Sequence, residues 1–103
     1  MKYATVCIDA VLNSDDKVFD YIIPDGLNVQ VGVRVLVPFG GRDVDGFVLG
    51  VSDKTNVPQD KLKSIAKVPD DFVAVKQEFL EILDGICNMF KLRKIDVLRL
   101  FVP

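Results

Sequence analysis

The sequence has no histidine, and only two of its 103 residues are cysteine. Without histidine, neither a Ser–His nor a Cys–His catalytic pair can form. No CxxC motif is present, so the sequence offers no zinc site either. Cys7 and Cys87 lie among apolar neighbours, which favours reduced core residues, although the sequence leaves a disulfide between them open.

Long apolar runs and nucleotide-binding loops are missing as well. No apolar run approaches the ~18 to 20 residues that span a bilayer, and Asp9 interrupts the apolar segment that a signal peptide needs. We therefore expect a soluble, cytoplasmic protein with no membrane partner. Gly40 and Gly41 lack the lysine and helix that follow a phosphate-binding loop. With no catalytic constellation, the chain alone is not expected to be an enzyme or to bind a cofactor or metal.

Excess positive charge is also absent, because the formal net charge is −2 at pH 7. Proteins that hold nucleic acid by its phosphates usually carry a basic excess, since counterion release supplies much of their affinity. Composition alone therefore argues against DNA binding. Any such binding would have to depend on a local pocket rather than on a broad basic surface.

What the sequence does have is a strong strand pattern over residues 2–68. Half of all residues are hydrophobic, which is enough for one domain with its own core. Apolar side chains alternate with a period of two, and a polar turn is expected at 13–16. The predicted strands span residues 2–12, 17–23, 33–37, 47–51 and 59–68, and the sequence leaves a helical turn at Gln59-Asp60-Lys61 open at the start of the last one.

A hairpin is predicted within residues 32–53. Pro38 is expected to end its first strand, because proline has no N–H to give to a ladder. Gly40 and Gly41 can then take the positive φ of a tight turn. Gly46 and Gly50 mark a bulge or a close backbone approach in the second strand.

From Phe72 onward the apolar period becomes helical. A second, short helix is expected over Lys94–Leu100. The predicted core-facing stripe of the first helix consists of Val75, Phe79, Ile82, Leu83, Ile86 and Phe90. Gly85 within this helix is expected to cost about 1 kcal/mol against alanine and to permit close packing.

The predicted fold class is mainly β with α. We expect an OB-like small β-barrel or curved antiparallel sheet of five or six strands over residues 1–68, followed by C-terminal helices over 72–103. Both parts belong to one domain, residues 1–103. The apolar end of the sequence suggests a domain taken from a longer polypeptide.

Two motifs carry a resemblance to a known family. The first is Phe19-Asp20-Tyr21-Ile22-Ile23-Pro24-Asp25-Gly26, and the second, from Gly32 to Gly40, has the order Gly-x-Arg-Val-x-Val-Pro-Phe-Gly. Their order and spacing resemble the N-terminal 3′ DNA-binding domain of the PriA family of replication-restart helicases (primosomal protein N′). The resemblance is close over residues 1–70. It is looser in the helical part, where Met89-Phe90 and residues 93–96 replace an aromatic pair followed by Pro-x-Gly.

The resemblance implies a DNA partner, namely the 3′ end of the nascent leading strand at a stalled replication fork. It further implies a full-length protein that is an ATP-dependent 3′→5′ DNA helicase with a zinc-binding insert. Primosome proteins and single-stranded DNA-binding protein would be partners of that longer protein. ATP and zinc would bind outside these residues.

The family's DNA 3′-end-binding positions correspond to Phe19, Asp20, Gly40 and Lys63, the last by its spacing after Pro58. An aromatic face can stack on any base, a carboxylate can accept a hydrogen bond from a 3′-hydroxyl, and a lysine can neutralise a phosphate. Glycine lets the backbone approach the ligand closely. The alternative is a small β-barrel protein-interaction or packing module, in which Asp20 is solvated or bonded to a nearby turn.

Overall fold

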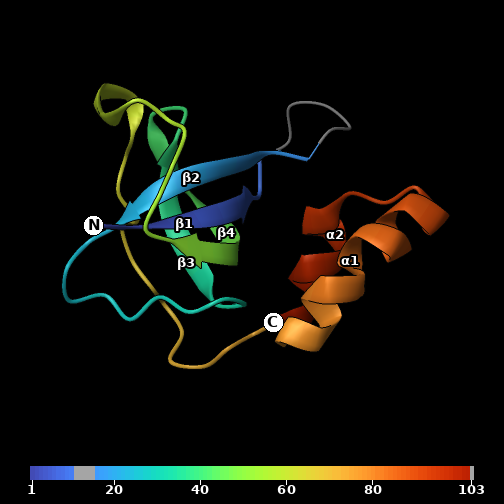
Figure 1. Cartoon of the computed structure of the whole chain (residues 1–103). Helices are drawn as coiled ribbons and strands as arrows, with labels where there is room; N and C mark the ends of the chain where they lie inside the picture. The colour runs from blue at the N-terminus through green and yellow to red at the C-terminus, as the bar shows by residue number, and fades with distance from the viewer. Residues whose placement is uncertain (11–15, 103) are drawn as a thin grey trace.

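The first half of the chain forms a four-stranded antiparallel sheet (Figure 1). The computed structural model describes residues 1–10 and 16–102, so the turn predicted at 13–16 lies mostly outside the described residues. The spatial order of the strands is β2-β1-β4-β3. Their bounds are β1 Lys2–Ile8, β2 Val18–Ile23, β3 Arg34–Phe39 and β4 Arg42–Ser52.

The long strand β4 bends the sheet. Its first half pairs with β3 and its second half with β1, and the register shifts between Thr5 and Val6 of β1. The partner residue on β4 changes there from Gly50 to Val48, so that one extra residue is accommodated as a bulge. A Cβ added to Gly46 would lie 2.5 Å from the Val6 side chain. Both predictions for the two glycines are confirmed.

The prediction that Pro38 ends a strand is wrong. Strand β3 continues to Phe39, with Pro38 paired to Asp43 in register. The strand is at the edge of the sheet, and Leu36, two residues earlier, directs its N–H away from β4 to Lys67. The Pro38 nitrogen faces the same way, so the missing N–H removes no bond between β3 and β4. The turn that follows has positive φ at Gly40 (62°) and Gly41 (82°), as predicted.

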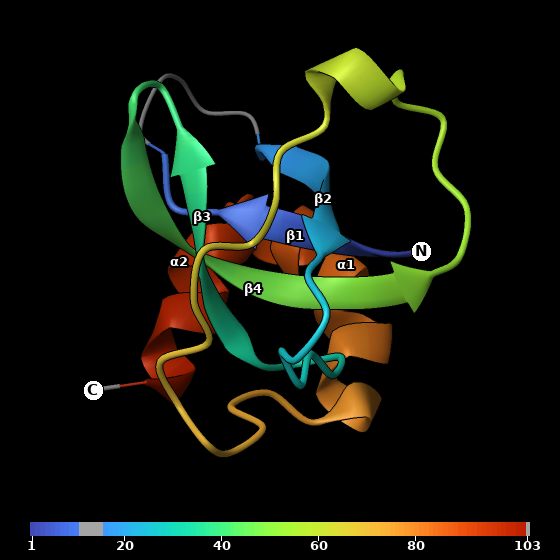
Figure 2. The same ribbon diagram turned by 90° about the vertical axis from the view of Figure 1, so that its left-hand side faces the viewer.

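The prediction of a further strand in 59–68, and with it the count of five or six strands, is also wrong, whereas the helical turn considered at 59–61 is present. This segment contains a short 3-10 helix, η1 (Gln59–Lys61), and two single bridges, Ser64 with Ile22 and Lys67 with Leu36. The segment thereby bonds to both edge strands across the open side of a sheet that is curved but not closed (Figure 2). A β + α architecture with a curved sheet is confirmed.

The helices lie together beside the sheet (Figure 1). They are α1 (Gln77–Phe90), α2 (Lys94–Leu98) and the 3-10 helix η2 (Arg99–Phe101). Helix α1 begins five residues later than the helical period suggests, because residues before it are held by the sheet: Val75 donates its N–H to the Gly32 carbonyl. The second short helix is confirmed.

The predicted apolar stripe of α1 is only partly core-facing. Leu83 and Cys87 are buried, whereas the side chains of Ile82 and Phe90 are 55% and 63% exposed. Successive residues are about 100° apart around a helix, which turns Ile82 away from the line through Leu83. The last turn of α1, which contains Phe90, projects away from the sheet (Figure 1).

Two clusters of buried side chains lie on the two faces of the sheet. The inner core, enclosed by the curved sheet and the 63–68 segment, contains Ala4, Val6, Ile8, Ala10, Tyr21, Val33, Val35, Val37, Val44, Val48 and Ile65. The helix-side core contains Cys7, Phe47, Val75, Leu83, Cys87, Ile95, Val97 and Leu98. Cys7 and Cys87 are free thiols, so no disulfide joins them. Over residues 1–10 and 16–102, no helix is long and apolar enough to cross a membrane.

Candidate functional site

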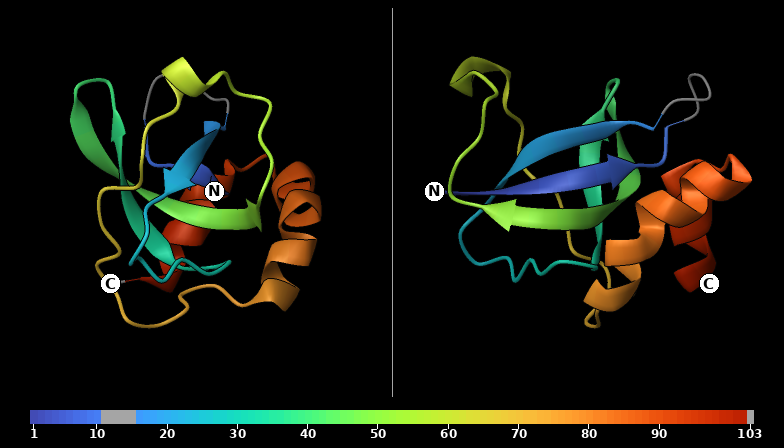
Figure 3. Two further views of the ribbon diagram at one scale, coloured as in Figure 1. Left: turned by 60° about the vertical axis from the view of Figure 1, so that its left-hand side comes forward. Right: turned by 45° about the vertical axis from the view of Figure 1, so that its right-hand side comes forward.

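A pocket of about 350 Å³ opens along the outer edge of β2. Its walls come from β2, from the end of β3 and from the segment that connects β4 to the 63–68 region (Figure 3). The lining residues are Val18, Phe19, Asp20, Tyr21, Pro38, Phe39, Val57, Lys61 and Lys63. The pocket therefore combines an apolar floor with two lysines and one carboxylate.

The alternating direction of main-chain N–H and C=O groups along β2 explains why the outer edge of this strand is accessible at Asp20. Ile22 donates its N–H to Lys63 (2.9 Å) and accepts from Ile65 (3.0 Å), so its main-chain polar groups point away from β1. Main-chain groups two residues apart in a strand point the same way. The N–H and C=O of Asp20 therefore also face away from β1, at the point where the neighbouring segment has left the edge and the pocket begins.

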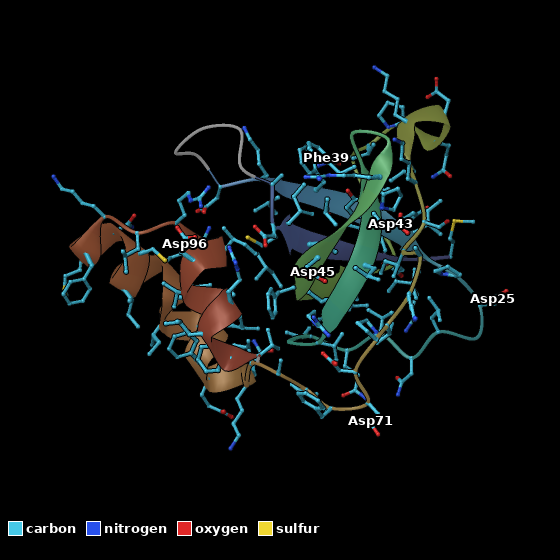
Figure 4. The ribbon with its side chains drawn as sticks, turned by 180° about the vertical axis from the view of Figure 1, so that it is seen from behind. Asp25, Phe39, Asp43, Asp45, Asp71 and Asp96 are labelled. Carbon is cyan, nitrogen blue, oxygen red and sulfur yellow. The ribbon has the colours of Figure 1, made fainter. Side chains whose placement is uncertain are left out.

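Two aromatic rings form one wall of the pocket. Phe19 of β2 and Phe39 of β3 are stacked, with ring centroids 5.5 Å apart and planes inclined by 27°. Phe39 lies near the tip of the β3–β4 hairpin (Figure 4). The Phe19 side chain is 41% exposed, which leaves aromatic surface available to a flat ligand.

Asp20 is held by two threonine hydroxyls. Thr5 donates to Oδ1 at 2.9 Å, and Thr55 donates to Oδ2 at 2.7 Å. Thr5 and Asp20 are directly opposite each other in a pair whose main-chain groups point outward, the arrangement in which cross-strand side chains approach most closely. Asp20 is thus bonded to a neighbouring strand and to a loop residue 35 positions away, not to a nearby turn. A carboxylate can accept about four hydrogen bonds, so each oxygen retains acceptor capacity.

Tyr21 connects the two edge strands beneath the aromatic pair. Its hydroxyl donates to the Pro38 carbonyl at 3.0 Å, and burial raises the pKa of the phenol. The phenol therefore stays protonated and keeps this bond at neutral pH. Tyr21 belongs to the inner core, so the floor of the pocket is continuous with the packed interior.

Three of the four predicted site residues lie together. Phe19, Asp20 and Lys63 line the pocket, although Lys63 is more than 40 positions away from the other two in sequence. Gly40 is not among the lining residues; it lies next to Phe39 in the hairpin turn, and a Cβ on it would meet nothing within 4 Å. Its requirement for glycine is therefore conformational, since its φ is 62°.

Sequence reasoning missed six lining residues: Val18, Tyr21, Pro38, Phe39, Val57 and Lys61. Three of them are part of the quoted motifs and could have been found there. Val18, Val57 and Lys61 carry no motif, and the course of the chain after β4 brings the last two to the pocket.

Within residues 1–10 and 16–102, the acidic residues form no competing metal site. Asp25, Asp43, Asp45, Asp71 and Asp96 are distributed over loops, the hairpin and the helical part (Figure 4). Among the residues that the structure describes, no group of three or more acidic or cysteine side chains could hold a metal ion.

Comparison with known proteins identifies the family of the chain. A sequence model described as the PriA 3′DNA-binding domain (3′BD) matches residues 5–103. The chain belongs to this family. The match includes the helical part, where the sequence departs from the family's motif. DNA binding in replication restart is therefore the general role of this domain family.

Three similar proteins carry the name replication restart protein PriA, one of them as probable. The chain is 30% identical over 105 residues to Replication restart protein PriA of Bacillus subtilis, a match that covers 100% of the chain and 13% of that protein. It is 33% identical over 104 residues to the Synechocystis protein of the same name, covering 98% of the chain and 12% of the relative. It is 36% identical over 90 residues to Probable replication restart protein PriA of Mycobacterium tuberculosis, covering 85% and 14%. The chain thus spans a small part of the length of these relatives.

Proposed function

We propose that the chain binds the 3′ end of a DNA strand in the pocket beside Phe19 and Asp20. The observation that supports this is the convergence of Phe19, Asp20 and Lys63 on one pocket from separate segments of the chain. These are three of the four positions carried over from the family's motifs. The proposal gives the domain a site for a terminal nucleotide.

Each wall of the pocket suits one part of a terminal nucleotide. The stacked aromatic pair offers a face for a base, and stacking tolerates any base. The main-chain N–H and C=O of Asp20 and its carboxylate offer donors and acceptors for hydroxyl and base-edge groups. Lys61 and Lys63 can neutralise a phosphate. This combination recognises an end without reading sequence.

The decisive experiment compares two DNA ends. A 3′-hydroxyl can donate to the Asp20 carboxylate, whereas a 3′-phosphate places negative charge against it. We expect a fluorescence titration to show tighter binding of a tailed oligonucleotide that ends in 3′-hydroxyl than of one that ends in 3′-phosphate. Asp20→Ala should remove most of this preference, while Phe19→Ala should weaken both ligands alike. Equal affinity of the unmodified chain for the two ends would exclude Asp20 as the end-reading residue.

Salt dependence provides a second measurement. Only two lysines line the pocket, and the chain carries a net charge of −2. If one or two phosphates are neutralised, the slope of log K against log salt should be roughly −1 to −2. A slope several times steeper would place the binding surface elsewhere.

In the longer protein, this domain would hold the 3′ end of the nascent leading strand at a stalled fork in the cytoplasm. An ATP-dependent 3′→5′ helicase, a zinc-binding insert, and contacts with primosome proteins and single-stranded DNA-binding protein would belong to the other parts of that protein. We infer these roles from the family resemblance. The pocket contributes only the end-binding step.

One observation favours the alternative of a protein-interaction module. Ile82, Met89 and Phe90 of α1 leave apolar surface exposed. This surface is separate from the pocket. If the chain binds no tailed or forked oligonucleotide, the interaction module becomes the better proposal.

A further inference from the structure

We infer that Thr55 is a positioning residue for the 3′-end pocket, an inference that rests on the proposed function. Its hydroxyl donates to Asp20 Oδ2 at 2.7 Å and accepts the main-chain N–H of Val57 at 3.2 Å. One hydroxyl therefore connects a carboxylate on β2 to the backbone of the pocket's opposite wall. Neither family motif quoted above contains Thr55.

The position of Thr55 in the chain allows this connection to place one wall of the pocket. Thr55 lies in the loop between β4 and η1, and the segment that follows supplies Val57, Lys61 and Lys63 to the pocket. A loop lacks the ladder of main-chain bonds that fixes a strand, so its side-chain bonds determine where it lies. By bonding to Asp20, Thr55 sets the distance between the carboxylate and the lysine-bearing wall before any ligand arrives.

A second attachment holds the far end of the same loop. Gln59 donates its side-chain amide to the Tyr3 hydroxyl at 3.0 Å. The loop is thus fixed to β2 through Thr55 and to β1 through Gln59. Only the Thr55 bond involves a residue of the pocket, so we expect it to have the larger influence on binding.

Thr5 provides a matched control because it bonds to the same Asp20 carboxylate. It donates to the other oxygen of Asp20, but it is a residue of β1 and is already fixed by main-chain pairing on both sides. Removing either hydroxyl takes one hydrogen bond from Asp20. Only removal of the Thr55 hydroxyl also releases the wall that carries Val57.

The preorganisation of the pocket determines the expected direction and size of the change in DNA affinity. A wall that is ordered before binding spares the ligand the entropy of ordering it, and a fixed carboxylate presents its free acceptor sites in one geometry. A hydrogen bond to a charged group contributes enough for a change of roughly tenfold in affinity when it is lost. Thr55→Val should therefore weaken binding of a 3′-hydroxyl oligonucleotide roughly tenfold, whereas Thr5→Val should have a clearly smaller effect. Thr55→Ser keeps the hydroxyl and should bind nearly as the unmodified chain does.

The test is a fluorescence titration of these three variants with 3′-hydroxyl and 3′-phosphate oligonucleotides. Thermal unfolding of each variant establishes that it is folded at the titration temperature. Thr55→Val should also reduce the preference for 3′-hydroxyl, a ratio that a purely structural loss of folded protein would not change. In an Asp20→Ala background, Thr55→Val should have much less further effect on that ratio, because the residue acts through Asp20.

The outcomes separate the two proposals. If the unmodified chain prefers the 3′-hydroxyl end but folded Thr55→Val keeps the same affinity and the same ratio, the positioning role is wrong and the proposed function stands. The role is equally wrong if Thr55→Ser fails as badly as Thr55→Val while remaining folded. If the unmodified chain binds neither oligonucleotide, the proposed function fails, and the inference about Thr55 fails with it.

Discussion

The two faces of the sheet are built for different tasks. Along β1, Val6 points into the inner core and Cys7, the next residue, points into the helix-side core. The inner core is formed by strands and the 63–68 segment, and it is almost entirely aliphatic. The helix-side core is completed by α1 and α2 and contains both thiols.

The difference shows which face supports the candidate site. Phe19 and Tyr21 of β2 share the face of Val6, so the pocket's aromatic floor is an extension of the inner core. No residue of α1 or α2 lines the pocket. Changes to the helix-side core should therefore alter stability with little effect on DNA binding, whereas changes at the pocket's floor should alter both.

The largest expected effect on stability comes from substituting Gly32, whose hydrogen bonds join the two faces of the sheet. Gly32 has φ 91°, donates its N–H to Val48 and accepts from Val75, and a Cβ on it would lie within van der Waals overlap of the Val75 carbonyl. Gly32→Ala should lower the free energy of unfolding by about 4 kcal/mol or more, measured by urea denaturation. Gly26 is the matched control, because its φ is 90° but a Cβ there meets nothing within 4 Å. Gly26→Ala should cost only about 1 to 2 kcal/mol. Similar losses for both glycines would show that φ, and not the contact with residue 75, limits position 32.

The second-largest loss of stability should come from creating a cavity in the helix-side core. Leu83 is 2% exposed on α1, and Leu83→Ala should lower the free energy of unfolding by about 3 kcal/mol. Because the pocket is formed from the other face, the Kd for a 3′-hydroxyl oligonucleotide should stay unchanged at temperatures where the variant is folded. A weaker Kd in folded Leu83→Ala would show that the two faces are coupled.

The counterpart at the pocket's floor is Tyr21→Phe. It removes one hydroxyl that bonds to the Pro38 carbonyl and should cost about 1 kcal/mol of stability. Although this loss is smaller than that of Leu83→Ala, the variant should bind the same oligonucleotide several-fold more weakly, because the bond holds β2 and β3 together beneath the aromatic pair. Unchanged binding would show that the stacked rings position themselves without it.

The helix-side core should also make stability depend on pH. Burial, with a smaller contribution from the charge of Asp16, raises the pKa of Cys7 from 9.0 to about 12. The stability that this shift contributes is fully present below pH 9 and is lost as the pH rises towards 12, at up to about 1.4 kcal/mol per pH unit. The pKa values of Cys87, Tyr21 and Lys94 are raised too, so their contributions fall in the same direction. Urea denaturation between pH 8.5 and 10.5 should give a shallower decline for Cys7→Ala than for the unmodified chain. Parallel declines would assign the pH dependence to the other groups.

Local features of this fold were predictable from the sequence. Alternation within each strand separates Val6 from Cys7 in β1, and Phe19 and Tyr21 from Asp20 in β2, and both separations are confirmed. The Gly40–Gly41 turn followed from the conformational freedom of two adjacent glycines. Each of these features depends on residues close together in sequence.

Features that depend on distant partners were not predictable in the same way. Whether Pro38 interrupts a strand depends on which edge of the sheet it occupies, and that is a property of the topology. Residues 63–67 have the alternation of a strand but bond to each edge strand at a single position, because they cross the open side of the sheet. The bond between Thr55 and Asp20 joins residues 35 positions apart, and no local pattern announces it.

The substitution with the smallest expected effect on stability is Gly85→Ala, which should stabilise the helix-side layer and leave the pocket unchanged. Gly85 lies within α1, and a Cβ there would meet nothing within 4 Å, so the close packing expected from the sequence is absent at this position. An alanine would restrict the unfolded chain and favour the helix, which should raise the free energy of unfolding by about 0.5 to 1 kcal/mol. Gly50→Ala is the control, since its Cβ would also meet open space but the residue lies beside the bulge of β4, outside any helix. Urea denaturation should show a larger gain for Gly85→Ala than for Gly50→Ala, with the Kd for the 3′-hydroxyl oligonucleotide unchanged in Gly85→Ala. Tighter or weaker DNA binding by Gly85→Ala would mean that the stability of α1 is transmitted through the sheet to the edge of β2.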